Sequence, residues 1–257
     1  MAYKVLNNVS VKDVTSSDLL SLKTDLLVIV INKNTKDKVV NQLAKDVSSH
    51  LKESGSSVLV PNAKSFNAKN VLLVKGFQDS DQIHKLISMY QSIAQKGNQL
   101  KAKDISIMPG TVYPKGKCEM WLIEMVAKTI ESNVYIFSET CNKTAKKPSV
   151  KKLNILVSSL TKSDLIKAKN AAKKGYAIGE GVNSAKYLGD LPANHCTPRI
   201  IEKKVKAMTK DFPKLKVKSF NENQMKKMGM GSFLSVSRGS EEPVSYTHLT
   251  LPTNRCV

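Results

Sequence analysis

The chain has 257 residues, 41% of them hydrophobic, which is enough for one large domain or two modest ones. Its longest apolar run, residues 26–31, is far shorter than the roughly 20 residues of a membrane-spanning helix, and its N-terminus lacks a signal peptide, so we expect a cytoplasmic protein without membrane contact. The net charge of +20 comes almost wholly from lysines spread along the chain, which favours at most weak, nonspecific nucleic-acid binding.

Alternating strand and helix patterns predict a layered α/β domain over residues 1–160. Residues 25–31, DLLVIVI, indicate a strand covered on both faces of a mainly parallel sheet. Apolar residues at every fourth position from Val39 to Leu51 predict a helix that ends near Gly55. The same reasoning predicts helices at 81–95 and 120–130, a loop at 141–152, and further strands at 57–60, 70–74, 104–108, 134–137 and 153–157.

Residues 161–190 predict one long helix that bridges two domains. Ser163 is its expected cap, and apolar or small residues follow at helical spacing as far as Leu188. Pro192 and Pro198 then bracket a loop. A helix at 200–208, an edge strand at 214–220 and a short helix at 222–228 before a glycine-rich turn complete the prediction. Too few residues remain for a second complete core.

Several short patterns resemble functional motifs but lack an essential part. Residues 110–118, GTVYPKGKC, place five residues between the glycines where a phosphate-binding loop has four, which favours a turn. Gly175, Gly179 and Gly181 lie within a helical pattern, which favours helix packing over a dinucleotide site. Ser237 lacks the first glycine of a nucleophile elbow, so we interpret it as a turn residue.

Metal-ligand and redox patterns are also missing. The cysteines, Cys118, Cys141, Cys196 and Cys256, form no CxxC pair, so reduced thiols are expected. The histidines show no ligand spacing, which favours surface or packing roles for His50, His84, His195 and His248. The adjacent pair Glu241 and Glu242 would point in opposite directions on an extended segment.

Two ordered blocks resemble the leucyl aminopeptidase, or cytosol aminopeptidase, family. Residues 185–198, AKYLGDLPANHCTP, match the spacing of A-x-x-L-x-[ND]-x-P-x-N-x-x-T-P, which opens the family's catalytic half. Residues 222–240, ENQMKKMGMGSFLSVSRGS, resemble its glycine-rich turn. The prolines and Thr197 can fix a loop and cap a helix, so both blocks are scaffold features before they are chemistry.

The resemblance implies an α/β fold with a macro-like N-terminal layered domain, a long bridging helix and an incomplete start of a zinc-peptidase-like catalytic domain. We therefore expect an N-terminal α/β domain at 1–160, the bridging helix at 161–190 and the catalytic-domain start at 191–243. The resemblance also implies a hexameric metalloprotease, a hydrolase that releases N-terminal amino acids from peptide substrates. Two ions, manganese or zinc, would activate its water.

The family's ligand blocks, G-K-G-x-x-x-D-S-G-G and N-T-D-A-E-G-R, do not occur in this sequence. We therefore assign no catalytic, substrate-binding or metal-ligand residue, and expect an inactive fragment that binds no metal. Residues 244–257 resemble nothing in the family, which suggests read-through or a frame error at the end of an incomplete gene. The alternative is a basic module that binds nucleic acid or a nucleotide, since some family members are DNA-binding regulators.

Overall fold

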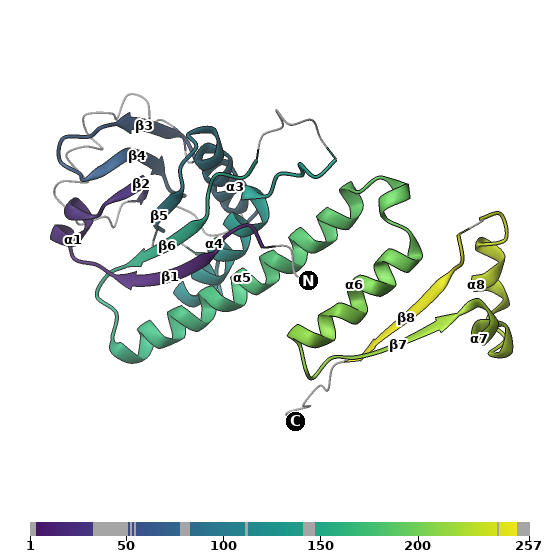
Figure 1. Cartoon of the computed structure of the whole chain (residues 1–257). Coiled ribbons are helices and arrows are strands. Elements are labelled where there is room, and N and C mark those ends of the chain that lie inside the picture. The colour runs from purple at the N-terminus through teal and green to yellow at the C-terminus, as the bar shows by residue number, and fades with distance from the viewer. Residues whose placement is uncertain are drawn as a thin grey trace. The chain divides into compact units, whose positions relative to one another are not determined.

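The computed structural model describes residues 4–32, 51, 53, 55–77, 83–110, 113–140, 147–240 and 242–250 (Figure 1). It divides into two compact units. The first consists of residues 4–183, and the second consists of residues 1–3 and 184–257. The division falls inside one long helix, α5 (Lys162–Asp190), so this helix begins in the first unit and ends in the second.

A six-stranded, mainly parallel sheet organises the first unit. Its order is β1-β6-β5-β2-β4-β3, and only the edge pair β3–β4 is antiparallel. The sheet places β2 between β5 and β4, and Leu26 to Ile29 of β2 are completely buried. The strands are β1 (Asn8–Asp13), β2 (Thr24–Ile31), β3 (Ser57–Pro61), β4 (Ala68–Lys75), β5 (Asp104–Met108) and β6 (Lys152–Val157).

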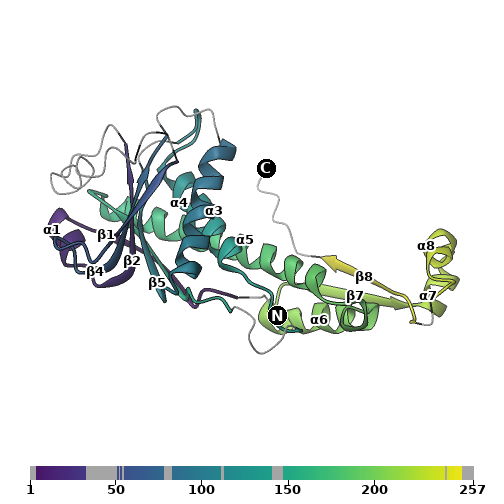
Figure 2. The same ribbon diagram turned by 90° about the horizontal axis from the view of Figure 1, so that it is seen from above.

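Helices lie on both faces of this sheet. Figure 2 shows α3 (Ile83–Gln99), α4 (Glu119–Val134) and α5 on one side, and the short α1 (Ser16–Ser21) on the other. On the α1 side, Leu19 packs into a cluster with Leu27, Ile29 and Phe66. The continuous apolar run of β2 is explained by this double cover, because both faces of the strand are excluded from water.

Most predicted elements of the first unit are confirmed, with three differences. The strand predicted at 134–137 is wrong, because Ile130 and Val134 continue the buried stripe of α4 to its last residue. Thr161, not Ser163, caps α5, since its hydroxyl accepts the Asp164 amide at 3.1 Å. The short elements β1 and α1 were not predicted. The helix expected from Val39 to Leu51 lies outside the described residues, apart from Leu51 itself.

The second unit combines the end of α5 with a two-stranded antiparallel sheet of β7 (Lys216–Asn221) and β8 (Ser245–Thr250). Its helices are α6 (Pro198–Asp211), α7 (Glu222–Lys227) and α8 (Gly231–Val236). Pro198 occupies the first turn of α6 as expected, but the Thr197 side chain makes no capping hydrogen bond, so the predicted capping hydroxyl is wrong. The predicted strand and helices of this region are otherwise present.

The second unit buries little apolar surface. Over residues 184–240 and 242–250, Met225 is fully buried and Leu215 is the only other buried hydrophobic residue. Large apolar side chains remain exposed, and Val236 keeps 89% of its accessible surface. This agrees with the expectation that too few residues remain for a second complete core, and it leaves apolar surface unburied in this part of the structure.

Two glycines let α5 approach α4 closely. A Cβ atom at Gly175 would lie 2.0 Å from the backbone oxygen of Glu124, and one at Gly179 would lie 2.7 Å from the Glu131 Cβ. Outside the neighbouring backbone of α5, no atom of the described residues lies within 4 Å of the same position at Gly181. Helix packing is therefore the reason for Gly175 and Gly179, as predicted, whereas the prediction is wrong for Gly181.

Beside these glycines, the carboxylate of Glu131 on α4 is completely buried. Its Oε1 accepts hydrogen bonds from the Val5 amide and the Asn183 side-chain amide, both at 3.0 Å, and its Oε2 accepts the Leu6 amide at 3.0 Å. Burial raises the pKa of Glu131 above its ordinary value, while the three donors oppose that shift. Because the donors come from the N-terminal segment and from α5, one side chain joins three parts of the chain.

The glycine contact predicts opposite effects of one substitution at two positions of α5. Gly175→Ala should destabilise the first unit by about 2 kcal/mol or more, because the Glu124 carbonyl is backbone and cannot move aside cheaply. Gly181→Ala, the matched control, should be neutral or stabilise by up to about 1 kcal/mol through helix propensity. Urea unfolding of both variants measures the difference. Equal effects would contradict the close α4–α5 contact.

The Glu131 carboxylate predicts a loss of stability on a nearly isosteric change. Glu131→Gln should lower the free energy of unfolding by about 1–3 kcal/mol. The glutamine NH₂ group would replace one carboxylate oxygen and would face a backbone N–H, so two donors would meet without an acceptor. Glu124→Gln is the control on the same helix: it removes only the ion pair with the largely exposed Lys174 and should cost at most about 1 kcal/mol. If thermal unfolding gives the two variants equal melting temperatures, the proposed role of Glu131 fails.

The small core of the second unit predicts selective proteolysis. Limited trypsin treatment should remove the C-terminal region at Lys186, Arg199 or nearby lysines and leave a resistant product that contains the first unit. Mass spectrometry of the time course identifies the cleavage points. A full-length chain that survives as long as the trimmed product would contradict this expectation.

Candidate functional site

The two sequence blocks that resemble the aminopeptidase family both lie in the second unit. Residues 185–198 form the last residues of α5, a short 3-10 helix (Ala193–His195) and the first residue of α6. Residues 222–240 form α7, α8 and the turns around them. Asn194 and the first α8 residues are exposed. These segments supply turns and helix starts.

Groups of three or more histidine, cysteine, aspartate or glutamate residues that could hold a metal ion do not occur in the described part of the chain. The donor set in this part therefore does not fit a site for two divalent ions. It stays a prediction that no residue of this chain has a catalytic, substrate-binding or metal-ligand role.

The histidines and cysteines considered above are scattered over separate elements. His84 lies in the first turn of α3, His195 in the 3-10 helix and His248 in β8 opposite Lys218. Cys118 precedes α4 and Cys196 follows the 3-10 helix, both as free thiols. His50, Cys141, Cys256 and Glu241 lie outside the described residues.

The motifs rejected on sequence grounds occupy turns. Ser237 ends α8, and its hydroxyl donates a hydrogen bond to the Leu234 carbonyl at 3.0 Å. Gly116 has a φ of +76°, and the Lys117 amide donates to the Pro114 carbonyl at 2.9 Å. Both arrangements are those of local turns, which agrees with the interpretation of these residues as structural.

The half-buried carboxylate of Asp25 at the start of β2 is an ordinary ion-pair partner. It lies 2.5 Å from the Lys69 ammonium and accepts the Lys103 amide at 2.8 Å. The hydrogen bond from Lys69 is the main cause that lowers the pKa of Asp25. A carboxylate with a lowered pKa is a weak general base, so Asp25 is a poor candidate for proton transfer.

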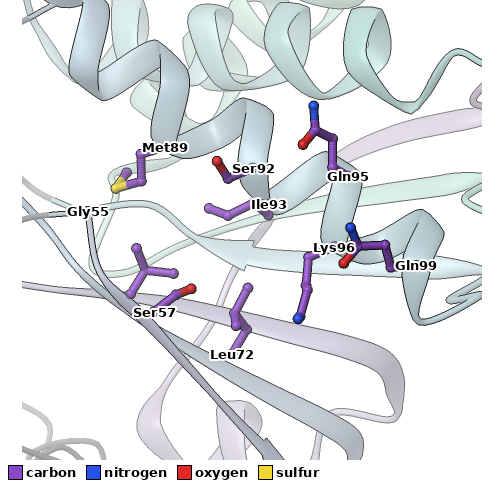
Figure 3. A pocket seen from close by; sticks show the side chains of 10 residues that line it. Gly55, Ser57, Leu72, Met89, Ser92, Ile93, Gln95, Lys96 and Gln99 are labelled. Carbon is purple, nitrogen blue, oxygen red and sulfur yellow. The ribbon is translucent and has the colours of Figure 1, made fainter. Parts of the chain in front are cut away.

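A cavity of about 210 Å³ lies between α3 and the β3–β4 edge of the sheet (Figure 3). Its buried lining is apolar, and its more exposed lining is polar. The sequence does not predict this cavity, because it is formed by β3, β4 and α3, which no motif connects. The available signal was the i, i+3, i+4, i+7 spacing of Ser92, Gln95, Lys96 and Gln99.

In the described ranges, no helix combines the length and the apolarity of a membrane span.

Comparisons with known proteins agree on one family. A family model described as "Cytosol aminopeptidase family, catalytic domain" matches residues 183–254, a range that includes most of the tail at 244–257. A probable cytosol aminopeptidase of Azotobacter vinelandii is 30% identical over 244 residues, which cover 90% of this chain and 48% of the relative. One of Pseudomonas paraeruginosa is 31% identical over 193 residues, covering 74% of this chain and 38% of the relative.

Solved structures show the same fold. A mutant of tomato leucine aminopeptidase superposes with a TM-score of 0.73 at 20% identity, covering 98% of this chain and 52% of that structure. The bottromycin maturation enzyme BotP in complex with Mn gives a TM-score of 0.67 at 17% identity, with 88% and 45% coverage. This chain therefore spans about half the length, or less, of the proteins it matches. With the two sequence blocks in their expected order, these matches mean that the chain belongs to the cytosol aminopeptidase family and corresponds to its N-terminal portion.

Proposed function

We propose that this chain is the scaffold portion of a leucyl-type metallo-aminopeptidase, a cytoplasmic enzyme that releases N-terminal amino acids from peptides. In this proposal residues 1–160 form the N-terminal domain, 161–190 the bridging helix and 191–243 the start of the catalytic domain. The observation that carries the proposal is the match of residues 183–254 to the family's catalytic domain, combined with relatives that extend over most of the first unit as well.

The family of the protein and the activity of this polypeptide are two different matters. Residues from the start of the catalytic domain are present, but the described carboxylates, histidines and cysteines do not gather into a metal site. The sequence also lacks both ligand blocks that the family resemblance implies. We therefore propose that this polypeptide, without further chain, does not hydrolyse peptides.

Assembly is a second part of the proposal. The whole enzyme would form a hexamer and hold two manganese or zinc ions, which polarise the scissile carbonyl and activate a water molecule. The exposed apolar side chains Phe212, Met228 and Val236 support a second unit that needs further structure against it. Nucleic-acid binding gains no support from the matched family or from the structures described above, and it is not part of this proposal.

A direct assay tests the functional proposal. The purified chain is incubated with leucine p-nitroanilide and added Mn²⁺, and the release of nitroaniline is followed. We expect no turnover above the buffer blank, because the residues that would fix two ions are missing from the sequence.

The cytosol aminopeptidase of Pseudomonas aeruginosa, which is 28% identical over 238 residues, is the positive control in the same buffer. Metal-dependent turnover that elutes with this chain through gel filtration, and is lost on chelation, would contradict the proposed inactivity. A mass spectrum of the active fraction excludes a contaminating host peptidase.

A further inference from the structure

The two-stranded sheet of the second unit has an open edge along β8. Among the described residues β7 is the only strand beside β8, so the outer side of β8 presents backbone N–H and C=O groups without a strand partner (Figure 1). The register with β7 is unbroken over the whole of β8, so no bulge bends this edge away. His248, Leu249 and Thr250 are exposed. Two strands alone are marginally stable in water, so this sheet gains from further strands.

The composition of β8 differs from that of the other edge strands. Its sequence, SYTHLT, contains no lysine, arginine, aspartate or glutamate, and no proline or glycine. The β1 edge has Lys12 and Asp13, the β7 edge has Lys216 and Lys218, and β3 ends at Pro61. Charged side chains and proline are the usual features that keep a strand edge from pairing with another chain. Of the four edge strands in the described part of the chain, β8 alone lacks them.

A helix and an aromatic cluster hold the two faces of β8. Ser245, at the start of β8, donates a hydrogen bond to the Glu202 carboxylate of α6 at 3.0 Å. Tyr246, which points to the opposite face, packs against Phe220 and Phe233 with ring centroids 6.0 Å and 5.6 Å apart. Neither contact involves the outer edge of β8, so both can persist when another strand pairs there.

Charge favours a second copy of this chain as the partner of β8. The net charge of +20 makes close approach of two copies repulsive at most surfaces. Antiparallel pairing of two β8 edges about a two-fold axis would place only uncharged side chains opposite one another. Lys218 of β7 would then lie three strand spacings, about 14 Å, from its copy. This exceeds the Debye length of about 8 Å at physiological ionic strength, so the repulsion is largely screened.

We propose that two copies of this chain associate through their β8 edges, in antiparallel orientation, to form a four-stranded sheet. The interface consists of one strand from each copy, so it is small, and the dimer is weak and depends on protein concentration. The pairing uses the second unit alone and does not rest on the proposed peptidase function or on any metal ion.

Sedimentation equilibrium of the full chain over a wide range of concentration measures this association. We expect a monomer–dimer equilibrium, which Leu249→Lys should weaken by about tenfold or more, because it places a lysine on the pairing strand of each copy. Val236→Lys is the matched control, since it replaces an apolar side chain that is 89% exposed on α8 by the same charge, and it should leave the equilibrium unchanged. If circular dichroism shows that Leu249→Lys misfolds, Thr250→Lys makes the same test from another exposed position of β8.

Amide hydrogen exchange locates the contact. Backbone amides of β8 should exchange more slowly at high concentration of the unmodified chain, and Leu249→Lys should lack this added protection. The proposal is overturned if the chain is monomeric at every concentration, if Leu249→Lys and Val236→Lys associate equally, or if a dimer forms without added protection of β8.

Discussion

The contact between α4 and α5 is the constraint on which the first unit depends. Gly175 and Gly179 remove the side chains that would hold these helices apart, and the Glu131 carboxylate then bonds donors from α5 and from the N-terminal segment. The Tyr176 hydroxyl adds a bond to the Leu6 carbonyl at 2.7 Å. A buried carboxylate with three donors is costly to disturb, because losing one donor leaves a desolvated oxygen unsatisfied.

This arrangement gives the two units of the chain different characters. The first unit has a sheet covered on both faces and many fully buried side chains. The second has two buried hydrophobic residues in its described ranges and several large exposed ones. The family model matches residues 183–254, almost all of them in the second unit, whereas a curated relative matches 90% of the chain.

The sequence predicted the elements whose pattern is local. The run of β2 and the spacing along α3 and α5 each indicated the right element, because burial on both faces of a strand gives a continuous apolar run and burial of one helix stripe gives apolar residues at helical spacing. The strand at 134–137 failed because Val134 belongs equally well to a helical stripe and to an apolar run. Thr161 and Ser163 are both good capping residues, and only the backbone geometry distinguishes them. The β1 strand was missed because polar residues alternate with only two valines.

The features that a motif could not predict all join distant segments. Glu131 meets Val5 and Leu6 across more than a hundred residues, and no spacing rule marks a buried carboxylate of this kind. The cavity is likewise formed by β3, β4 and α3 and has no sequence signature of its own. The resemblance of two scaffold blocks, in contrast, indicated the family correctly, whereas the absence of metal ligands from those blocks stays a prediction.

The central claim is that this chain carries the framework of a two-ion peptidase without the side chains that hold the ions. Calorimetric titration of the metal-free chain with Zn²⁺ and with Mn²⁺ measures this most directly. The account predicts no saturable binding beyond weak, nonstoichiometric heats. Tight uptake of a pair of ions by each chain, at sites that resist competition from magnesium, would contradict it.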